Sequence, residues 1–321
     1  MKKFFITGAA GFIGSHVCEH IAKKFPKDLI FAIDKLTYAG NKFFLKQLLN
    51  KKNFTFLKSD ILDTNNYIRY LNNIDCAINI AAESHVDNSF RNSIKFTKTN
   101  TLGAHVFLEN CINSQVKKII HISTDEVYGD KIKGSSYETD IMNPTNPYSA
   151  SKAAAEMIIN SYKYVYKKDI IIIRANNIYG TRQFPEKLIP SCIVSLLKNK
   201  KISIHGDGRN IRHYLSVQDF CDALTIIIKK TNKGIYNIGT GESYRNIKIA
   251  KKICKLMNKL SSNIKFTKDR AFNDRRYSIS SKKIHKLGWK PKKKLFNELN
   301  IIIDWYKKHK KIFDKRTTKF S

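Results

Sequence analysis

The sequence has few acidic residues and no closely spaced cysteines. The cysteine pattern argues against zinc-binding and disulfide-stabilised proteins. Its 321 residues include 26 Asp and Glu, and six cysteines that form no CxxC or Cys/His cluster: Cys18, Cys76, Cys111, Cys192, Cys221 and Cys254. This scatter argues against a zinc site and against a disulfide framework. No apolar run approaches the roughly 20 residues that span a bilayer, and MKKFFITGAAGFIG lacks the long apolar stretch of a signal peptide. We therefore expect a globular protein of a reducing, cytoplasmic compartment, without metal or membrane contact.

The scarcity of acids leaves a net charge of +33, from 59 Lys and Arg, which raises the question of nucleic-acid binding. A nucleic-acid site would need the basic residues to be clustered. Instead, the lysines occur as short doublets over the whole chain, beside abundant Ile and Asn. This pattern favours a coding bias over a binding groove, so we expect no nucleic-acid partner. The basic stretch KKHKKIFDKRTTKF (307–320) is the best candidate for a nucleic-acid or membrane contact, but a solvated chain end is the simpler interpretation.

Short apolar runs alternate with stretches of helical spacing along the first half of the chain. We expect buried strands at residues 4–7, 29–33, 54–57, 76–81, 118–123 and 170–174. Strands that are apolar on both faces are typical of parallel sheets covered by helices on both sides. The predicted fold class is therefore α/β, a doubly wound parallel sheet over residues 1–175. A smaller α/β substrate-binding region follows over residues 176–321, part of which is expected to return to the first domain.

The stretch TGAAGFIG places Gly8, Gly11 and Gly14 between the first expected strand and a helix that begins near Phe12. Glycines there permit a tight turn and close approach of the backbone to a pyrophosphate, which the N–H groups of the helix N-terminus attract. Asp34 follows at the end of the second strand, where a carboxylate accepts the ribose hydroxyls of NAD and repels the 2′-phosphate of NADP. The pattern predicts a Rossmann-type NAD-binding domain; a tight turn without ligand is the alternative.

Two adjacent acids, Asp125 and Glu126, directly follow the apolar run of the fifth expected strand in HISTDEVYGD. A solvated pair at a strand end, or a helix cap, is the ordinary interpretation of such acids. Further on, NPYSASK places Tyr148 and Lys152 on one face of a predicted helix. There the Lys152 ammonium would lower the pKa of Tyr148, so that the phenol exchanges a proton with a substrate hydroxyl while hydride moves. Two exposed side chains are the alternative.

Together these features resemble the extended short-chain dehydrogenase/reductase family. The glycine turn, Thr124, the Tyr148/Lys152 pair and RANNIYG (174–180) carry the broad resemblance. More narrowly, the chain from Lys3 to about Tyr306 resembles the nucleoside-diphosphate-glucose 4,6-dehydratases, through DKLTYAGN, AAESHVDNSF, STDEVYGD, NPYSASK, FPEKLIP and DRAFNDRRY. The sugar epimerases of the same family carry small or hydroxyl residues where the acid pair stands, so the pair indicates a dehydratase.

The resemblance implies an NAD-dependent hydro-lyase that binds a nucleotide sugar and forms a homodimer through helices including the one that carries Tyr148. Its catalytic residues would be Thr124, Asp125, Glu126, Tyr148 and Lys152. NAD would be held by Gly8, Gly11, Phe12, Ile13, Gly14, Asp34, Lys35, Thr37, Asp60, Ile61, Ala81, Ala82, Tyr148 and Lys152. The hexose would lie near Glu83, Ser84 and His85, and the nucleoside diphosphate near Asn177, Lys187, Arg212, Asn246 and Arg270. The ordinary alternatives are that Lys187 and Arg270 are surface charges and that His85 is a structural histidine.

Removal of water across C5 and C6 of glucose needs a transient C4 ketone, a base at C5 and an acid for the departing C6 hydroxyl. Two neighbouring carboxylates divide the last two tasks when their environments push their pKa values apart. By resemblance, Tyr148 takes the C4 hydroxyl proton as hydride passes to NAD, with Thr124 bonded to the same oxygen. Glu126 then removes the C5 proton and Asp125 protonates the C6 hydroxyl, before the hydride returns to C6. The product would be a 4-keto-6-deoxy sugar nucleotide.

The sequence resembles both dTDP-glucose and UDP-glucose enzymes, so the resemblance leaves two alternatives for the base of the nucleotide. Many bacterial dTDP-glucose enzymes read Asn-Asn-Tyr-Gly where this chain has Asn177-Ile178-Tyr179-Gly180, and have aspartate at the position of His213. HVDNSF, IHGDG and AFNDRRY also resemble the UDP-glucose 4,6-dehydratases. We expect dTDP-glucose, the commoner substrate in the family, with UDP-glucose as the alternative. A sugar-nucleotide epimerase or decarboxylase, and a Rossmann-type protein that binds RNA without catalysis, are the rival functions.

Overall fold

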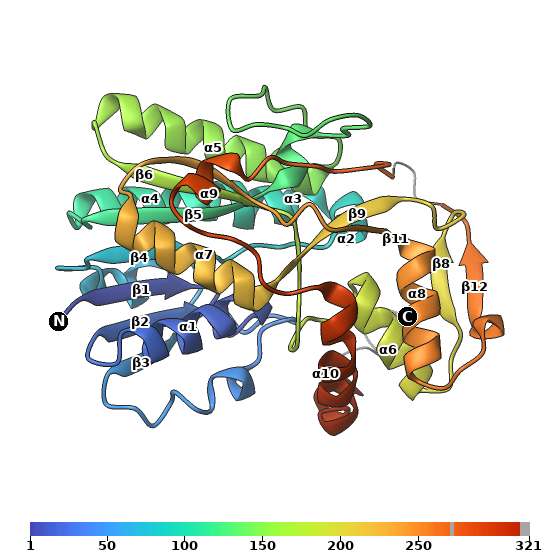
Figure 1. The fold of residues 1–321 in the computed structure, drawn as a ribbon. Helices are drawn as coiled ribbons and strands as arrows, with labels where there is room; N and C mark the ends of the chain where they lie inside the picture. The colour runs from blue at the N-terminus through green and yellow to red at the C-terminus, as the bar shows by residue number, and fades with distance from the viewer. Residues whose placement is uncertain (270–272, 315–321) are drawn as a thin grey trace.

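All six strands expected in the first half of the chain pair side by side in one parallel sheet. The computed structural model describes residues 1–269 and 273–314. Its main sheet has seven strands in the order β10-β6-β5-β4-β1-β2-β3, and every neighbouring pair is parallel (Figure 1). The strands are β1 (Lys3–Thr7), β2 (Leu29–Asp34), β3 (Phe54–Lys58), β4 (Cys76–Asn79), β5 (Lys118–Thr124), β6 (Ile170–Ala175) and β10 (Gly234–Ile238). The predicted doubly wound α/β fold is confirmed.

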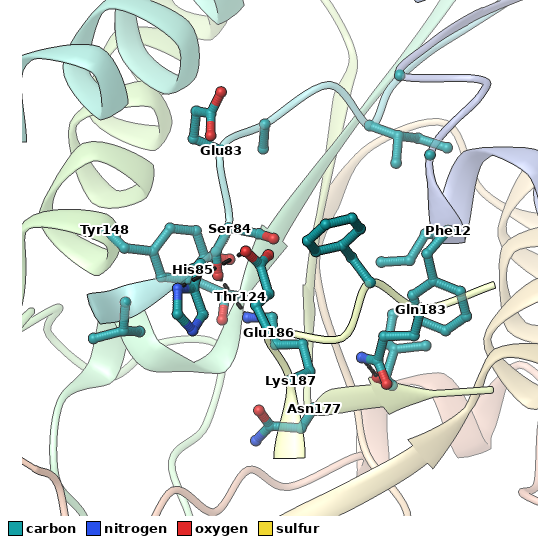
Figure 2. A pocket seen from close by; sticks show the side chains of 18 of the residues that line it. Phe12, Glu83, Ser84, His85, Thr124, Tyr148, Asn177, Gln183, Glu186 and Lys187 are labelled. Carbon is teal, nitrogen blue, oxygen red and sulfur yellow. Dashed lines mark hydrogen bonds and ion pairs between the residues drawn. The ribbon is translucent and has the colours of Figure 1, made fainter. Parts of the chain in front are cut away.

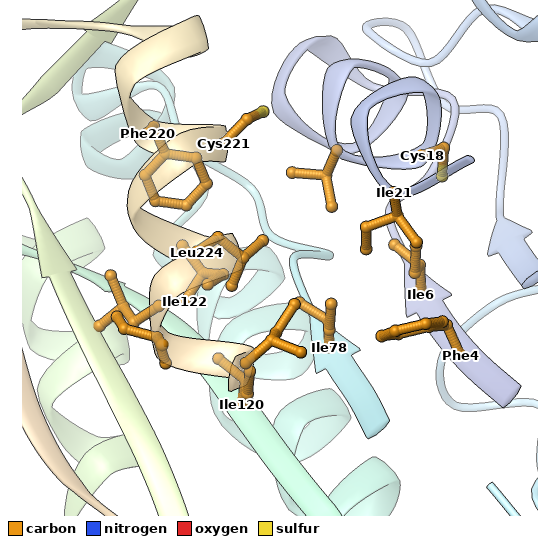
Figure 3. Packing of buried hydrophobic residues seen from close by; sticks show 14 of the residues in the cluster. Phe4, Ile6, Cys18, Ile21, Ile78, Ile120, Ile122, Phe220, Cys221 and Leu224 are labelled. Atoms are coloured by element: carbon orange, nitrogen blue, oxygen red, sulfur yellow. The ribbon is translucent and has the colours of Figure 1, made fainter. Parts of the chain in front are cut away.

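Helices cover both faces of this sheet, which explains the nearly continuous apolar strands. On one face α1 (Phe12–Lys24) packs beside α7 (Val217–Lys230), and on the other α4 (Gly103–Asn113) packs beside α5 (Pro147–Val165). Consecutive strand residues point to opposite faces. Phe4 therefore joins the cluster with Phe220 under α1 and α7 (Figure 3), whereas Phe5 joins the cluster with Phe107 and Ile159 under α4 and α5.

The strand order reverses between β1 and β4, and this switch point is where open α/β sheets bind ligands at the carboxyl ends of their strands. Gly8 turns the chain out of β1 with a φ of +66°, a conformation that favours glycine. A Cβ atom at Gly8 would lie 2.8 Å from the backbone nitrogen of Ala81, two residues after β4. Glycine at this position therefore lets the two loops meet closely at the switch point.

Much of the second half of the chain forms a smaller region with its own core. It contains a three-stranded sheet of β7 (Asn177–Tyr179), β9 (Ile211–Ser216) and β11 (Ser243–Arg245), and a pair of β8 (Ile202–His205) and β12 (Ile264–Thr267). Apolar side chains of α6 (Leu188–Leu197), α8 (Asn246–Leu256) and α10 (Leu295–Lys308) share this core. In contrast, β10 and α7 belong to the main sheet and its covering layer. The division of the chain into domains at residue 175 stays a prediction.

Short elements connect these layers. They are the α-helices α2 (Val86–Arg91), α3 (Ser93–Phe96), α9 (Lys282–Lys286) and α11 (Lys311–Asp314), the π-helix η4 (Thr97–Leu102), and the 3-10 helices η1 (Lys42–Leu45), η2 (Thr64–Asn66), η3 (Ile68–Tyr70), η5 (Asp125–Tyr128) and η6 (Ser261–Asn263). Within residues 1–269 and 273–314, no helix has the length and apolar character needed to cross a membrane. The same residues contain no group of three or more His, Cys, Asp or Glu that could hold a metal ion.

A buried ion pair ties α5 to the middle of the sheet. Arg174 on β6 makes three hydrogen bonds of 2.6 to 3.1 Å to the Glu156 carboxylate on α5. Ser123 on β5 donates a further bond of 2.5 Å to Glu156, and the Arg174 guanidinium lies 4.6 Å from the Tyr128 ring centre. Both charged side chains are almost completely buried. Removing one partner would therefore leave an uncompensated charge in a nonpolar environment.

Neutralising Glu156 should destabilise the protein much more than neutralising an exposed acid. We expect Glu156→Gln, which keeps the side-chain size, to lower the free energy of unfolding by about 3 kcal/mol or more, because Arg174 loses its counter-charge. The matched control is Asp304→Asn, which weakens a 3.3 Å ion pair between two exposed side chains, Asp304 and Lys307, and should cost less than about 1 kcal/mol. Chemical denaturation measures both values, and similar losses in the two variants would contradict the expectation.

Candidate active site

The predicted site residues come together in one cavity of about 740 Å³ at the carboxyl edge of the main sheet. Its walls include the loops after β1, β2, β4, β5 and β6 on one side, and α6, β8 and β9 on the other. The cavity is lined by each predicted residue that the structure describes: Gly8, Gly11, Phe12, Ile13, Gly14, Asp34, Lys35, Thr37, Asp60, Ile61, Ala81, Ala82, Glu83, Ser84, His85, Thr124, Asp125, Glu126, Tyr148, Lys152, Asn177, Lys187, Arg212 and Asn246. Arg270 lies outside the described residues.

The glycine turn leaves the N-terminus of α1 open toward the cavity. Gly11 is the N-cap, so no side chain caps the first turn, and the first turn contains no acid. A Cβ atom at Gly14 would lie 2.0 Å from the Gly8 carbonyl oxygen, so the tight packing of helix against turn requires glycine there. A helix N-terminus with free N–H groups and no acid in its first turn attracts phosphate. These features fit the pyrophosphate of a dinucleotide.

Asp34 closes the adjacent corner of the cavity, at the end of β2. One carboxylate oxygen accepts the Ala10 backbone N–H at 2.9 Å, and the other accepts the Leu36 N–H at 2.7 Å. Burial raises the pKa of Asp34, while these backbone bonds oppose the shift. Nearby, Lys35 pairs with Asp60 at 2.6 Å. A carboxylate has about four lone-pair positions, so Asp34 can accept ribose hydroxyls in addition to these backbone bonds.

Asp125 and Glu126 are buried at the end of β5, with exposed fractions of 2% and 8%. Thr124 ends β5 as the N-cap of η5, and its hydroxyl accepts the Glu126 backbone N–H at 3.2 Å. The two acids therefore neither face solvent nor cap a helix themselves. The ordinary interpretation of the pair as a solvated strand end is wrong.

The two carboxyl groups have different surroundings. Burial and the neighbouring charge of Glu126 raise the pKa of Asp125 to about 7, although Asn176 donates a 2.6 Å hydrogen bond to it. Burial also raises the pKa of Glu126, but Lys187 and Arg212 favour its ionised form. Asp125 can therefore hold a proton near neutral pH, whereas two cations support the charge of Glu126.

Tyr148 is the second residue of α5 and lies close enough to Thr124, Asp125 and Glu126 to be affected by all three. Asn146 is the N-cap of this helix and forms a capping box with Ser149, with Pro147 in the first turn. Burial and the charge of Glu126 raise the pKa of Tyr148, and within the described chain Thr124 is the group that lowers it. The predicted lowering by Lys152 is therefore wrong: burial outweighs any such effect in the structure.

Lys152 is buried one turn further along α5. Its Nζ donates a 2.6 Å hydrogen bond to the Ile122 carbonyl and lies 3.4 Å from the His121 ring. Burial lowers the pKa of Lys152 to about 8, and Glu156 opposes the shift. The lysine therefore interacts with β5 as well as sharing a helix face with Tyr148.

The predicted substrate residues form the other wall. Lys187 donates a 2.6 Å hydrogen bond to the Ser84 carbonyl, and Figure 2 shows both near His85 and Glu186. Lys187 is thus no free surface charge. His85 lies 3.8 Å from Glu186, and the pKa of Glu186 is raised to about 7 by burial. Glu83 is buried and pairs with Lys95 at 2.8 Å.

Three groups point to a ligand at the far end of this wall. The Asn177 amide nitrogen and the Asn246 amide oxygen are buried without a hydrogen-bond partner among the described residues. Buried polar groups nearly always have partners. Arg212 donates to the Asn273 side chain at 3.1 Å and lies 4.9 Å from the Tyr277 ring centre. The arrangement offers a cation and two free amide groups to a polar ligand.

Sequence reasoning missed several residues that contact the predicted ones. Asn146 and Asn176 donate to Glu126 and Asp125, Glu186 lies beside His85, and His121 lies beside Lys152. Asn146 could have been found as the cap before Pro147, and Glu186 belongs to the quoted FPEKLIP stretch. Contacts of Asn176 and His121 depend on tertiary structure and have no local signal.

Removing the Asn176 amide should raise the pKa of Asp125 above its value of about 7. The amide stabilises the ionised carboxylate, and a hydrogen bond to a charged group is worth about 1.5–3 kcal/mol, or about one pKa unit or more. We therefore expect an upward shift in Asn176→Ala, measured by 13C NMR titration of the aspartate carboxyl carbons. The sequence neighbour Asn177→Ala is the control. Equal shifts, or none, would contradict the assignment.

Comparison with known proteins identifies the family. The family profile described as GDP-mannose 4,6 dehydratase matches residues 5–300. An Arabidopsis thaliana trifunctional UDP-glucose 4,6-dehydratase/UDP-4-keto-6-deoxy-D-glucose 3,5-epimerase/UDP-4-keto-L-rhamnose-reductase is 43% identical over 95% of this chain, which spans 47% of that protein. The dTDP-D-glucose 4,6-dehydratase of Dictyostelium discoideum is 42% identical, over 97% of this chain and 82% of that one.

A solved structure of a dehydratase also matches this chain. The dTDP-glucose 4,6-dehydratase DesIV from Streptomyces venezuelae, with NAD and TYD bound, has a TM-score of 0.95 at 33% identity, over 98% of this chain and 99% of that chain. The match extends over both the main sheet and the smaller region, and the family profile covers the whole cavity from the glycine turn to the second wall. This chain belongs to the GDP-mannose 4,6 dehydratase family.

Proposed function

We propose that this chain converts dTDP-glucose to dTDP-4-keto-6-deoxyglucose, with NAD as a tightly bound cofactor. The observation that carries the proposal is the buried pair Asp125 and Glu126, in the same cavity as Tyr148 and the glycine turn. Elimination of water needs an acid and a base beside an oxidisable carbon, whereas C4 epimerisation needs neither carboxyl group. The names of the Dictyostelium and Streptomyces relatives support this choice of reaction.

NAD fits the residues at the switch point. The open N-terminus of α1 would bind the pyrophosphate, and the carboxylate of Asp34 would accept the adenosine ribose hydroxyls. A side chain at Gly8 would meet the Ala81 backbone, and one at Gly14 would meet the Gly8 backbone, so glycine at both positions keeps the turn compact beside the proposed cofactor site. Bound there, NAD would accept a hydride from C4 of the sugar and return it to C6.

The protein's own groups would move the protons. Tyr148 would take the proton of the C4 hydroxyl, with Thr124 donating a hydrogen bond to the same oxygen. The transient ketone acidifies the C5 hydrogen, which Glu126 would remove because Lys187 and Arg212 favour its ionised form. Asp125, with a pKa of about 7, would protonate the leaving C6 hydroxyl.

The second wall of the cavity would hold the nucleotide sugar. Arg212 and Lys187 supply cations for the diphosphate, and the partnerless amides of Asn177 and Asn246 supply a donor and an acceptor. Glu83, Ser84 and His85 would lie along the hexose. Arg270, outside the described residues, stays a predicted phosphate ligand on the resemblance alone.

UDP-glucose is the second candidate substrate, favoured by two observations. The Arabidopsis relative, whose name includes UDP-glucose 4,6-dehydratase, is 43% identical to this chain. In addition, His213 stands where many bacterial dTDP-glucose enzymes have aspartate, and burial and Arg276 lower its pKa to about 4. A neutral imidazole therefore follows Arg212 in the sequence where those enzymes have a carboxylate, although His213 itself does not line the cavity.

We also propose a cytoplasmic homodimer joined through helices including α5, which carries Tyr148. The outer face of α5 carries exposed apolar side chains that contact nothing within the described chain's core, among them Met157, Tyr164 and Val165. Contiguous exposed apolar groups of this kind mark interaction surfaces. All six cysteines are free and buried, which suits a reducing compartment.

A charge on the outer face of α5 should separate the dimer. We expect Met157→Asp to shift the protein from dimer to monomer, because a desolvated carboxylate would face the partner. Leu260→Asp, at a still more exposed apolar position between α8 and β12, should leave the dimer intact. Sedimentation velocity distinguishes these states. A monomeric parent protein, or a dimer that survives Met157→Asp, would exclude α5 as the interface.

The reaction itself is tested by mass spectrometry of the products. With NAD present, we expect the parent protein to produce from dTDP-glucose a species lighter by one water, and UDP-glucose serves as the second arm. Glu126→Gln should lose this activity by at least about 100-fold, the typical contribution of a general base, while still binding NAD. Loss of water from neither sugar nucleotide, by a folded protein with bound NAD, would refute the dehydratase function.

A further inference from the structure

A glycine outside the cavity lies against the amide that bonds to Asp125. Asn176 directly follows β6 and Gly239 directly follows β10, and the two strands pair in parallel so that Ala175 stands opposite Ile238. The Asn176 backbone N–H donates a 3.0 Å hydrogen bond to the Ile238 carbonyl. Asn176 and Gly239 are therefore neighbours across the strand ends, and of the two it is Asn176 that lines the cavity.

The Asn176 side chain occupies the space that a side chain at position 239 would need. A Cβ atom at Gly239 would lie 2.1 Å from Asn176 Oδ1 and 3.0 Å from its Cγ. The next nearest atom, Cγ1 of Ile279, would be 3.1 Å away. Atoms that are not bonded approach one another to about 3.5 Å. Even a methyl group at position 239 therefore cannot fit while Asn176 keeps its place.

The backbone of Gly239 is held from both of its polar groups. Its N–H donates a 2.8 Å hydrogen bond to Ser281 Oγ, and the Ser281 hydroxyl donates a 2.9 Å bond to the Gly239 carbonyl. Both residues are buried, so a backbone shift would leave polar groups unpaired away from water. The φ of Gly239 lies outside the left-handed region, so alanine can adopt its conformation. The group that can move is the end of the Asn176 side chain.

Movement of that side chain would break its bond to the acid. Asn176 Nδ2 donates the 2.6 Å hydrogen bond to Asp125 Oδ2, and the oxygen that faces Gly239 belongs to the same planar amide. We propose that Gly239 is a positioning residue, whose missing side chain lets the Asn176 amide lie against Asp125. The catalytic consequence rests on the proposed function, in which Asp125 protonates the leaving C6 hydroxyl.

Other groups around Asp125 titrate or carry charge. Burial and the charge of Glu126 on η5 raise the pKa of Asp125, whereas Asn176 and Arg212 on β9 lower it. Tyr148 on α5 is close enough to be affected by the Asp125 charge. The three atoms nearest to a methyl group at position 239 belong to none of these titratable or charged residues. Such a methyl group would therefore reach Asp125 through the amide.

Gly239→Ala should raise the pKa of Asp125 above its value of about 7. The methyl group displaces an amide that favours the ionised carboxylate, a loss equivalent to about one pKa unit or more. The measurement is a 13C NMR titration of the aspartate carboxyl carbons in the full chain, with Asp125→Asn to identify the signal. A pKa that stays unchanged or falls would overturn the proposal.

Asn176→Ala provides the background that isolates the contact, because it removes the Cγ and Oδ1 atoms that the methyl group would meet. In the double variant, Gly239→Ala should add no shift to that of Asn176→Ala alone. Shifts that add would mean that the methyl group acts by another route, and the proposal would fail. If Gly239→Ala alone does not fold, the double variant should fold with the Asp125 pKa of Asn176→Ala, and an unfolded double variant would contradict the proposed contact.

Thr240→Val is the structural control in the same loop. The Thr240 hydroxyl donates a 2.8 Å bond to the Tyr214 carbonyl and accepts the Glu242 N–H at 3.0 Å. Valine keeps the size of threonine but removes both bonds. We expect a lower free energy of unfolding with an unchanged pKa of Asp125. A shift equal to that in Gly239→Ala would show that any disturbance of the loop suffices, which would overturn the proposal.

The pH dependence of water loss gives the catalytic readout. Asp125 acts while protonated, so the rate should fall as pH rises through its pKa, and a raised pKa moves this alkaline limb to higher pH. We expect the limb to move in Gly239→Ala but not in Thr240→Val. A raised pKa with an unmoved limb would overturn the catalytic role of Gly239. If the NMR shifts hold and the parent protein dehydrates no sugar nucleotide, the proposed function fails while the positioning of Asn176 by Gly239 stands.

Discussion

The burial of two adjacent carboxyl groups at the end of β5 is the constraint on which the rest of the site depends. Asp125 and Glu126 leave water together, and two charges so close would both be strongly disfavoured without compensation. The structure compensates unequally: each carboxyl group accepts a bond from an asparagine amide and is favoured in its ionised form by Arg212, but Lys187 favours the ionised form of Glu126 in addition. Unequal compensation is what lets one group hold a proton while its neighbour stays ionised.

A parallel sheet is suited to collecting such groups. Its strands all end at one edge, so residues far apart in sequence meet there without any special loop. The glycine turn after β1, the acid pair after β5 and Asn176 after β6 share this edge, and the smaller region closes it with Lys187 and Arg212. The cavity is thus a consequence of strand direction, and its chemistry depends on the first residues after each strand.

Local spacing made much of this predictable. The glycine turn, the acid pair and the Tyr148/Lys152 pair each lie within a few residues of chain, so sequence reasoning found them together with the six strands. Sequence reasoning failed where burial determines the pKa of a side chain. The pKa of Tyr148 is raised, because desolvation and Glu126 outweigh the expected lysine effect. Likewise Asn176 and His121 act through neighbours from other strands, which no local pattern displays.

Helix α5 connects the sheet to the active site, because its inner face is held to the sheet at two successive turns. Lys152 bonds to the Ile122 carbonyl of β5, and one turn further Glu156 bonds to Arg174 of β6. Both bonds are inaccessible to water, so neither is weakened by solvent competition. They fix the rotation of the helix and hence the direction of Tyr148, while the exposed Met157 faces outward. A partner docked on that outer face would restrain the same helix that positions the phenol, so assembly and catalysis would share one element.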